Sequence, residues 1–217
     1  HDDFPYYHFP YTYYLTQENL VIGAGQLVHA FRTPSSIFYL NSLFYLPIIE
    51  YFLFNMGAIL ILGFSNLILI FKLKNDFKSK RYDFIFFLTL LSFLFINIFF
   101  YRIAEHGTDR SAQILILILF IEVLNFYRMS INKEKIFTKI FILLGLIITL
   151  KAFYVLYLLI LIPILIEIKK SRLFLNFLKN FYFYIFCSVG FFLILIKEYY
   201  DFEYPIRSIS RYYPSFN

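Results

Sequence analysis

Long apolar runs separated by short polar loops are the feature that most constrains the fold of this chain. A helix rises about 1.5 Å per residue and the hydrocarbon core of a bilayer is about 30 Å thick, so a full span takes about 20 residues. Charged residues make up only 16% of the chain and hydrophobic residues 60%, whereas soluble domains carry about 25% charge. The sequence therefore predicts an all-α, polytopic transmembrane helical bundle with about six membrane segments. The runs that predict these segments are 45–71, 83–101, 112–127, 136–150, 152–168 and 181–196.

The fourth and fifth runs are separated only by Lys151, in the stretch LIITLKAFYVLY. A single helix over 136–168 would be about 50 Å long, so a hairpin of two helices with Lys151 near the turn fits the bilayer better. As separate helices, the two runs rise only about 22 and 25 Å. We therefore expect their outer ends to stop below the membrane surface and to leave a recess, floored by Lys151 and rimmed by Arg102 and Arg110.

The distribution of Lys and Arg predicts the orientation of the chain. Thirteen of the 20 basic residues fall on alternate loops, and the positive-inside rule places such loops in the cytoplasm. The net charge of +6 is therefore a signal of topology and not of nucleic-acid binding. We expect 72–81, 128–139 and 169–180 to be cytoplasmic, and 1–42, 102–111 and 197–217 to be extracytoplasmic.

This topology predicts three regions. Residues 1–42 form an extracytoplasmic first loop, 43–196 a transmembrane helical domain, and 197–217 the start of a further extracytoplasmic loop. Within the first loop, apolar residues recur at helical spacing over 20–31, and Thr16 is in position to cap the helix start. Two glycines and a short apolar stripe argue against a span, so we expect an amphipathic helix in the outer membrane interface.

The predicted outer side holds the histidines and the candidate reactive carboxylates. The chain opens with HDDFPYYHFPY, in which Asp2 and Asp3 lie close to His1 and His8. A carboxylate can act as a general base towards a hydroxyl group, although a solvated loop start is the simpler interpretation of the pair. A divalent metal bound by one of these histidines with an Asp is compatible with the residue types, but spacing alone does not specify one.

Three features in this order resemble the GT-C superfamily of polytopic membrane glycosyltransferases: the Asp2–Asp3 pair, the amphipathic helix and the uneven spans. The stretch VIGAGQLVHAFRTPSSIFYLNSLF also resembles the same region of uncharacterised bacterial membrane proteins grouped near this superfamily. The resemblance covers residues 1–45, and the remainder only by hydropathy. In the superfamily the first extracytoplasmic loop follows the first transmembrane helix and carries the catalytic Asp or Asp/Glu pair. The resemblance thus implies that the chain is a fragment that lacks this first helix.

The resemblance implies transfer of a hexose or pentose from a polyprenyl-phosphate-linked donor to an acceptor hydroxyl on a glycan, lipid or protein. The reaction would take place on the outer face of the bacterial inner membrane and serve the cell envelope. Asp2 or Asp3 would be the general base, with Asp201 and Glu203 as alternatives, and no cofactor is implied. The residues expected to bind the substrate or its phosphate are Lys151, Arg110, Arg102, His29, His106 and Arg207.

Two further function classes stay open, a transporter or flippase of lipid-linked glycans and a polymerase or ligase of such glycans. A transporter would carry polar groups in mid-span, for which Asn55, Asn66 and Asn97 are candidates, but the sequence shows no internal repeat. Glu122, in LFIEVLNFY, lies about two turns from the cytoplasmic end of its run. We expect its carboxylate to snorkel to the interface.

Overall fold

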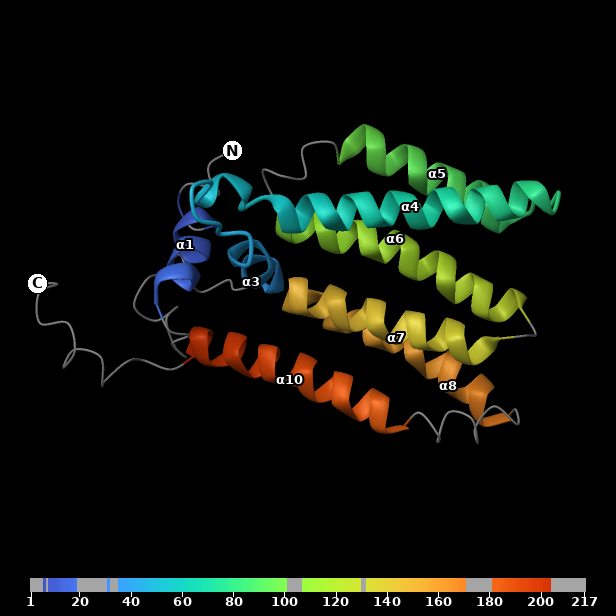
Figure 1. Cartoon of the computed structure of the whole chain (residues 1–217). Coiled ribbons are helices and arrows are strands. Elements are labelled where there is room, and N and C mark those ends of the chain that lie inside the picture. Colours follow the sequence, from blue (N-terminus) through green and yellow to red (C-terminus); the bar gives the residue numbers. More distant parts are fainter. Residues whose placement is uncertain are drawn as a thin grey trace, which may run out of the picture.

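The computed structural model describes residues 6, 8–18, 31, 35–100, 107–129, 132–170 and 181–203. This part of the chain is helical, and its only β feature is an isolated bridge between Leu46 and Glu50, so the predicted all-α class is confirmed. The elements in chain order (Figure 1) are α1 (Phe9–Gln17), α3 (Ser36–Ser42), the 3₁₀ helix η3 (Tyr51–Leu53), α4 (Met56–Lys78), α5 (Phe84–Phe99), α6 (Gly107–Arg128), α7 (Lys133–Leu150), the 3₁₀ helix η5 (Ala152–Ile160), α8 (Leu161–Lys170) and α10 (Phe181–Glu203).

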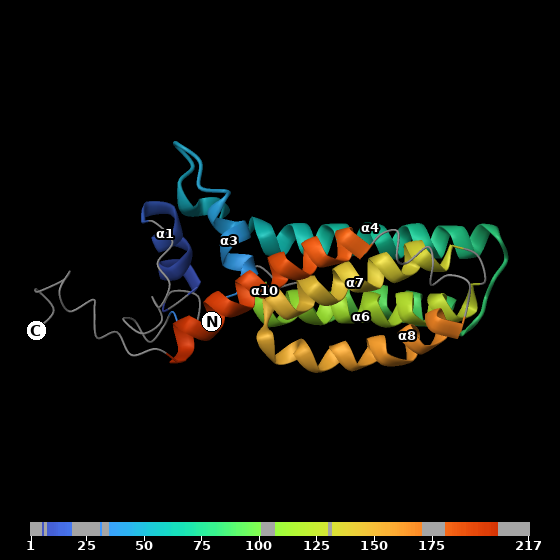
Figure 2. The same cartoon turned by 90° about the horizontal axis from the view of Figure 1, so that it is seen from below.

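The long helices lie side by side in a bundle, which Figures 1 and 2 show from two directions. Helix α6 contacts α4, α5 and α7, and α10 packs against α7. This central position explains the burial of α6, in which Ile114, Ile118 and Leu119 are at most 1% exposed. The two short helices α1 and α3 contact each other beside one end of the bundle, and α3 also contacts α4 and α7.

The two ends of the bundle differ in what surrounds them. We call the end beside α1 and α3, where α7 stops at Leu150, the capped end. At the opposite end α4 stops at Lys78 and α6 stops at Arg128. We call this the basic end, because it carries the described residues of the predicted cytoplasmic loops 72–81 and 128–139.

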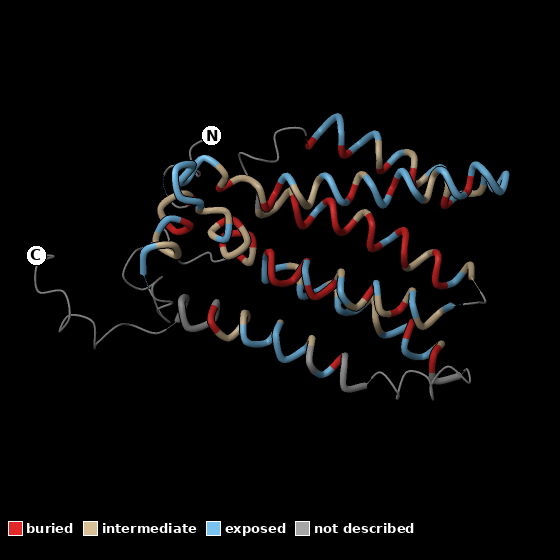
Figure 3. Tube along the Cα trace, viewed as in Figure 1, coloured by how far each residue is buried: buried red, intermediate tan, exposed pale blue. Residues whose placement is uncertain are grey.

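Helix α5 has the side-chain distribution expected of a helix in lipid. Its buried face carries Thr89 and Ser92, at 0% and 3% exposure, whereas Phe87 is 58% exposed, and Figure 3 shows how much of the surface of this helix is open. Membrane bundles place small and polar residues at helix contacts because lipid solvates the large apolar side chains. By length and composition, two helices of the described chain are able to cross a membrane, Tyr51–Lys78 and Thr108–Arg128.

The predicted division of the chain at Lys151 is confirmed. Helix α7 ends at Leu150, Lys151 is extended with φ −157° and ψ 116°, and η5 returns along α7. The predicted shortness is wrong for the second arm but not for α7. The 9 residues of η5 are 3₁₀ and the 10 residues of α8 are α-helical, so together they rise about 33 Å. Helix α7 has 18 residues and α6 has 22, which gives about 27 and 33 Å. The length argument for a recess at Lys151 therefore loses one of its two arms. The 3₁₀ stretch makes the η5–α8 arm long enough for the roughly 30 Å core, whereas α7 stays slightly shorter than that core.

The first and last predicted spans have different bounds from their apolar runs. Residues 45–55 form turns and η3, with positive φ at Ile48 and Glu50, and these backbone angles are incompatible with a continuous α-helix. Helix α4 consequently starts at Met56. At the other end of the chain, α10 continues to Glu203, into the region predicted as a loop.

The N-terminal region begins with a helix that the sequence pattern did not predict. Thr16 lies in the last turn of α1, where its hydroxyl donates to the carbonyl of Tyr13 at 2.6 Å, so its predicted role as an N-cap is wrong. The proline at the start of α1 favours a helix there because its fixed φ suits the first turn. The predicted amphipathic helix over 20–31 lies outside the described residues except for Phe31.

Gly57 gives a test of how α3 is joined to α4. Its backbone N–H donates to the side-chain oxygen of Asn41 at 2.9 Å, and a Cβ at Gly57 would lie 2.5 Å from that oxygen. We expect Gly57→Ala to lower the free energy of unfolding by about 1–3 kcal/mol through overpacking, measured by thermal unfolding in detergent. The matched control in the same helix is Gly63→Ala, which meets nothing within 4 Å and gains helix propensity. Equal changes in the free energy of unfolding for Gly57→Ala and Gly63→Ala would contradict this close contact between α3 and α4.

Candidate functional site

Two of the predicted site residues, Lys151 and Arg110, belong to the described chain, and both lie at the capped end. Arg110 follows Asp109 in the first turn of α6 and is half-buried. Within the described ranges, no three His, Cys, Asp or Glu side chains gather as a metal-binding group, so the predicted metal alternative has no described donor set. The other predicted site residues, Asp2, Asp3, Arg102, His29, His106 and Arg207, lie outside the described residues.

Lys151 forms an ion pair with Asp109 of α6. The extended backbone of Lys151, between α7 and η5, directs its side chain towards the start of α6. Both side chains are 47% exposed, so water reaches the pair, although the Oδ1 atom of Asp109 that faces Lys151 is buried. The sequence argument treated Lys151 as a lone ammonium in need of an anion, and the structure corrects this, because a carboxylate from another helix already lies beside it.

The N-terminal helices reach the same end of the bundle. The hydroxyl of Ser35 donates to the carbonyl of Leu150 at 2.6 Å, which fixes the start of α3 at the corner beside Lys151. Lys197 of α10 is 7% exposed and donates to the hydroxyl of Tyr11 in α1 at 2.8 Å. These two contacts hold the chain that follows Asp2 and Asp3 against the ends of α7 and α10.

Among the described residues, the capped end therefore brings together an exposed cation, Lys151, the half-buried Arg110 and the buried Lys197. Lys151 is half exposed and keeps its charge at the surface. Lys197 is buried between the rings of Tyr11 and Tyr39, with its nitrogen 5.5 and 5.6 Å from the ring centroids. Lys151 is thus the group that is able to meet an incoming anion, while Lys197 serves to hold α1 in place.

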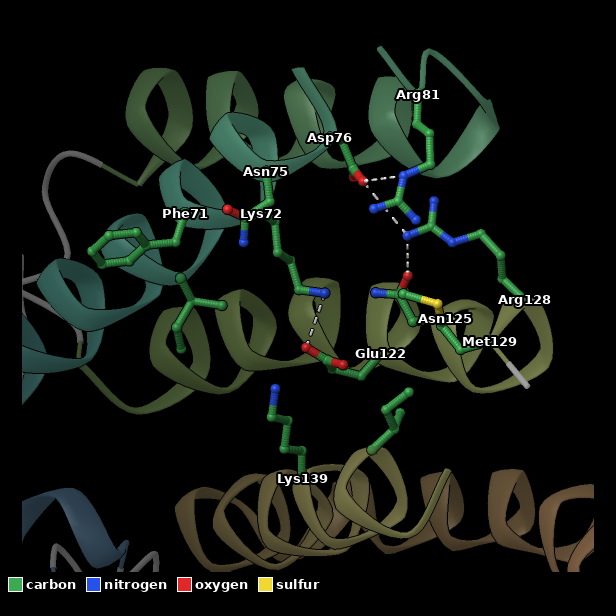
Figure 4. Close-up of a pocket in the computed structure, with 12 residues that line it drawn as sticks. Phe71, Lys72, Asn75, Asp76, Arg81, Glu122, Asn125, Arg128, Met129 and Lys139 are labelled. Atoms are coloured by element: carbon green, nitrogen blue, oxygen red, sulfur yellow. Dashed lines mark hydrogen bonds and ion pairs between the residues drawn. The ribbon is translucent and has the colours of Figure 1, made fainter. Parts of the chain in front are cut away.

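A cavity of about 410 Å³ lies at the basic end, between α4, α6 and α7 (Figure 4). The sequence argument did not predict it. Its wall is polar on one part and apolar on another, and Figure 4 shows side chains from the three helices converging on it. We call it the basic-end cavity; its lining residues are Ile68, Phe71, Lys72, Asn75, Asp76, Arg81, Glu122, Asn125, Arg128, Met129, Ile136 and Lys139.

Glu122 lies in this cavity and does not snorkel. The residue is 4% exposed, and its carboxylate forms an ion pair with Lys72 of α4 at 3.0 Å. The expected snorkelling is wrong because α4 packs against α6 and brings a cation to the carboxylate inside the bundle. A buried carboxylate needs such a partner, since desolvation of an unpaired charge is costly.

Arg128, at the end of α6, joins three elements of the basic end. Its guanidinium donates to Asp83 at 2.7 Å and to Asn125 at 2.7 Å, and it lies 3.8 Å from Asp76. Asp83 also caps α5 by accepting from the N–H of Phe86 at 3.0 Å. The hydrogen bond from Arg128, together with that backbone bond, lowers the pKa of Asp83 below its usual value.

The sequence contained one signal for the ion pairs around Arg128, namely two acids near a basic loop. Asp76 and Asp83 are carboxylates within or beside the basic loop 72–81, where an orientation argument counts only the cations. Each of these acids has an Arg partner in the structure. Acids that interrupt a basic loop are therefore better read as partners for specific cations than as exceptions to the topology rule.

Two of the three asparagines that suggested a transporter form a closed pair, and the third, Asn55, is not in mid-span because it precedes the first residue of α4. Asn66 of α4 donates to the side-chain oxygen of Asn97 at 3.3 Å, and Asn97 donates back to Asn66 at 2.8 Å. Reciprocal amide bonds of this kind join helices in membranes, because lipid offers no other partner. The pair has the form of a link between α4 and α5 rather than a relay for a transported ion.

A family model described as a domain of unknown function (DUF8201) matches residues 1–207. The match includes both the N-terminal helices and the helical bundle. No curated protein and no solved structure matches the chain.

Proposed function

Since the chain belongs to the DUF8201 family, whose description assigns no function, we propose from its own residues that it is a polytopic membrane glycosyltransferase of GT-C type. It moves a sugar from a polyprenyl-phosphate-linked donor to an acceptor hydroxyl on a glycan, lipid or protein. The reaction takes place on the outer face of the bacterial inner membrane. The observation that carries the proposal is the accessible Lys151–Asp109 pair, beside which α1 and α3 hold the segment that follows Asp2 and Asp3.

The proposal includes six membrane segments, formed by α4, α5, α6, α7, the η5–α8 arm and α10. Support comes from the outward-facing apolar side chains, for example Leu91, Phe192 and Leu193 at 60–63% exposure, because monomeric soluble proteins seldom expose such surface continuously. The basic residues of 72–81 and 128–139 then lie on the cytoplasmic side. The capped end is consequently on the outer side.

The proposed chemistry divides between two groups of residues. The carboxylate of Asp2 or Asp3 takes the proton of the acceptor hydroxyl, whose oxygen attacks the anomeric carbon while the bond from that carbon to the phosphate oxygen breaks. The leaving phosphate needs positive charge close to it, which Lys151 and Arg110 supply. Asp109 compensates the charge of Lys151 until the phosphate takes its place.

The test of this function is release of polyprenyl phosphate. Purified protein is reconstituted in vesicles with a polyprenyl-phosphate-linked sugar and an acceptor, and the freed lipid phosphate is measured. Turnover that depends on the acceptor supports transfer. Movement of the intact donor between leaflets, without cleavage, would instead support the flippase alternative and overturn the transferase.

Replacement of Lys151 by methionine is expected to weaken donor binding, since it removes the accessible ammonium. Asp109→Asn removes the competing carboxylate and is expected to strengthen binding of the same donor. The control is Lys78→Met at the basic end, which should leave donor binding unchanged. Unchanged binding in both Lys151→Met and Asp109→Asn would leave the pair as a link between helices only.

The orientation is tested by cysteine labelling in intact cells, with the native Cys187 replaced by serine. A cysteine at Tyr6, which is 74% exposed, is expected to react with an impermeant reagent from outside. A cysteine at Lys78, also exposed, is expected to react only after permeabilisation. Reaction at Lys78 in intact cells would contradict both the orientation and the proposed site.

A further inference from the structure

The basic-end cavity has the two-part lining of a site for an amphipathic ligand. Ile68, Phe71, Met129 and Ile136 form its apolar part, and Phe71 is 59% exposed, so this part opens towards the outer surface of the bundle. The polar part carries four cations, Lys72, Arg81, Arg128 and Lys139. A ligand that fills both parts needs an anionic head and a hydrocarbon chain.

The charges of the cavity wall do not balance among themselves. Four cations and two carboxylates, Asp76 and Glu122, line it. Lys72 is paired with Glu122, Arg81 and Arg128 each lie 3.8 Å from Asp76, and Arg128 is paired more closely, at 2.7 Å, with Asp83 outside the cavity lining. Lys139 extends from α7 towards the cavity (Figure 4), and it forms no ion pair within the described part of the chain.

A second observation also indicates a ligand, because one buried donor in the cavity wall has no hydrogen-bond acceptor in the part of the chain that the structure describes. The Nε–H of Arg128 is buried and finds no hydrogen-bond acceptor among the described residues. A buried donor without a partner costs free energy, and an anionic oxygen bound in the cavity is one group that removes this cost. Arg128 and Lys139 come from neighbouring helices, so one headgroup is able to meet both.

We propose that the basic-end cavity binds the phosphate headgroup of an anionic phospholipid, with a chain along Phe71 and Ile68. Basic pockets between transmembrane helices on the cytoplasmic side are suited to such headgroups. Free phosphate would satisfy the cations but would leave the apolar wall unused, which favours the lipid. The inference rests on the membrane-spanning part of the proposed function and does not depend on the transfer reaction.

The test uses native mass spectrometry of the full chain released from neutral detergent, with added phosphatidylglycerol or phosphatidylcholine. We expect retention of phosphatidylglycerol and about fivefold weaker affinity in Lys139→Gln, the effect of one removed cation near a headgroup. Lys139 is exposed, so the variant should keep its fold. The matched control is Lys135→Gln, which is exposed on the same helix but does not line the cavity.

Two results would overturn the proposal. Equal lipid affinity in Lys139→Gln and Lys135→Gln would show that the charge of the cavity is irrelevant. Displacement of the lipid by millimolar inorganic phosphate, with phosphate retained in its place, would identify free phosphate as the ligand. Because no sugar donor is present, failure here leaves the transferase test unaffected, and failure of that test leaves this one unaffected.

Discussion

Replacement of Lys72 by methionine is expected to lower the free energy of unfolding by about 3–5 kcal/mol, since removal of one partner of a buried ion pair leaves the other charge uncompensated. The side chain of Glu122 is 5% exposed and that of Lys72 is 20% exposed, so the carboxylate is the less accessible of the two charges. The cost arises from this buried anion and not from the lost attraction alone. The measurement is reversible unfolding in mixed detergent.

The double variant Lys72→Met/Glu122→Leu separates the two explanations of such a loss. Replacing both charges with apolar groups removes the desolvation cost, and the outcome of such replacements is often neutral. We therefore expect the double variant to recover most of the lost stability. Lys74→Met is the control, because Lys74 is exposed on the same helix and should change the free energy by less than about 0.5 kcal/mol. A double variant no more stable than the single one would show that the pair is not buried together.

The replacement of Asp2 and Asp3 by asparagine is expected to have the largest effect on activity. Asparagine keeps the shape of the side chain but cannot accept the hydroxyl proton, so loss of the base should lower turnover by about 10²–10⁴. Adjacent side chains point in different directions, so we expect one of the two single variants to carry most of this loss. Both variants should enter the membrane normally, which their recovery in the membrane fraction would show.

The other outer carboxylates provide the comparison for this prediction. Asp201→Asn and Glu203→Gln alter residues at the end of α10 and are expected to leave turnover within a few-fold of the native value. Full activity in the Asp2→Asn/Asp3→Asn double variant would exclude this pair as the base. A large loss in the Asp201 or Glu203 variant alone would move the base to α10.

The helical segments and the turn at Lys151 were predictable because they depend on local sequence. Each apolar run contains a helix, since lipid or a helical core satisfies its side chains while the helix satisfies its own backbone. A lysine between two apolar runs marks a turn, because an ammonium is costly within the membrane. The first and last residues of the helices, and the type of helix, were less predictable. Whether residues such as 152–160 form a 3₁₀ or an α-helix depends on packing against α7.

The polar contacts were decided by tertiary structure. Lys197 and Tyr11 are 186 residues apart in the chain, and Arg128 and Asp83 are 45 apart, so no local pattern links them. Glu122 shows the consequence most clearly: its position in an apolar run predicted snorkelling, whereas the packing of α4 on α6 supplied Lys72 inside the bundle. The sequence by itself determined the long helical segments and the charged residues, but not α1 or the turns over 45–55. Only the packing of helices determined which charges meet, because the cost of burying a charge depends on the partner that the fold places beside it.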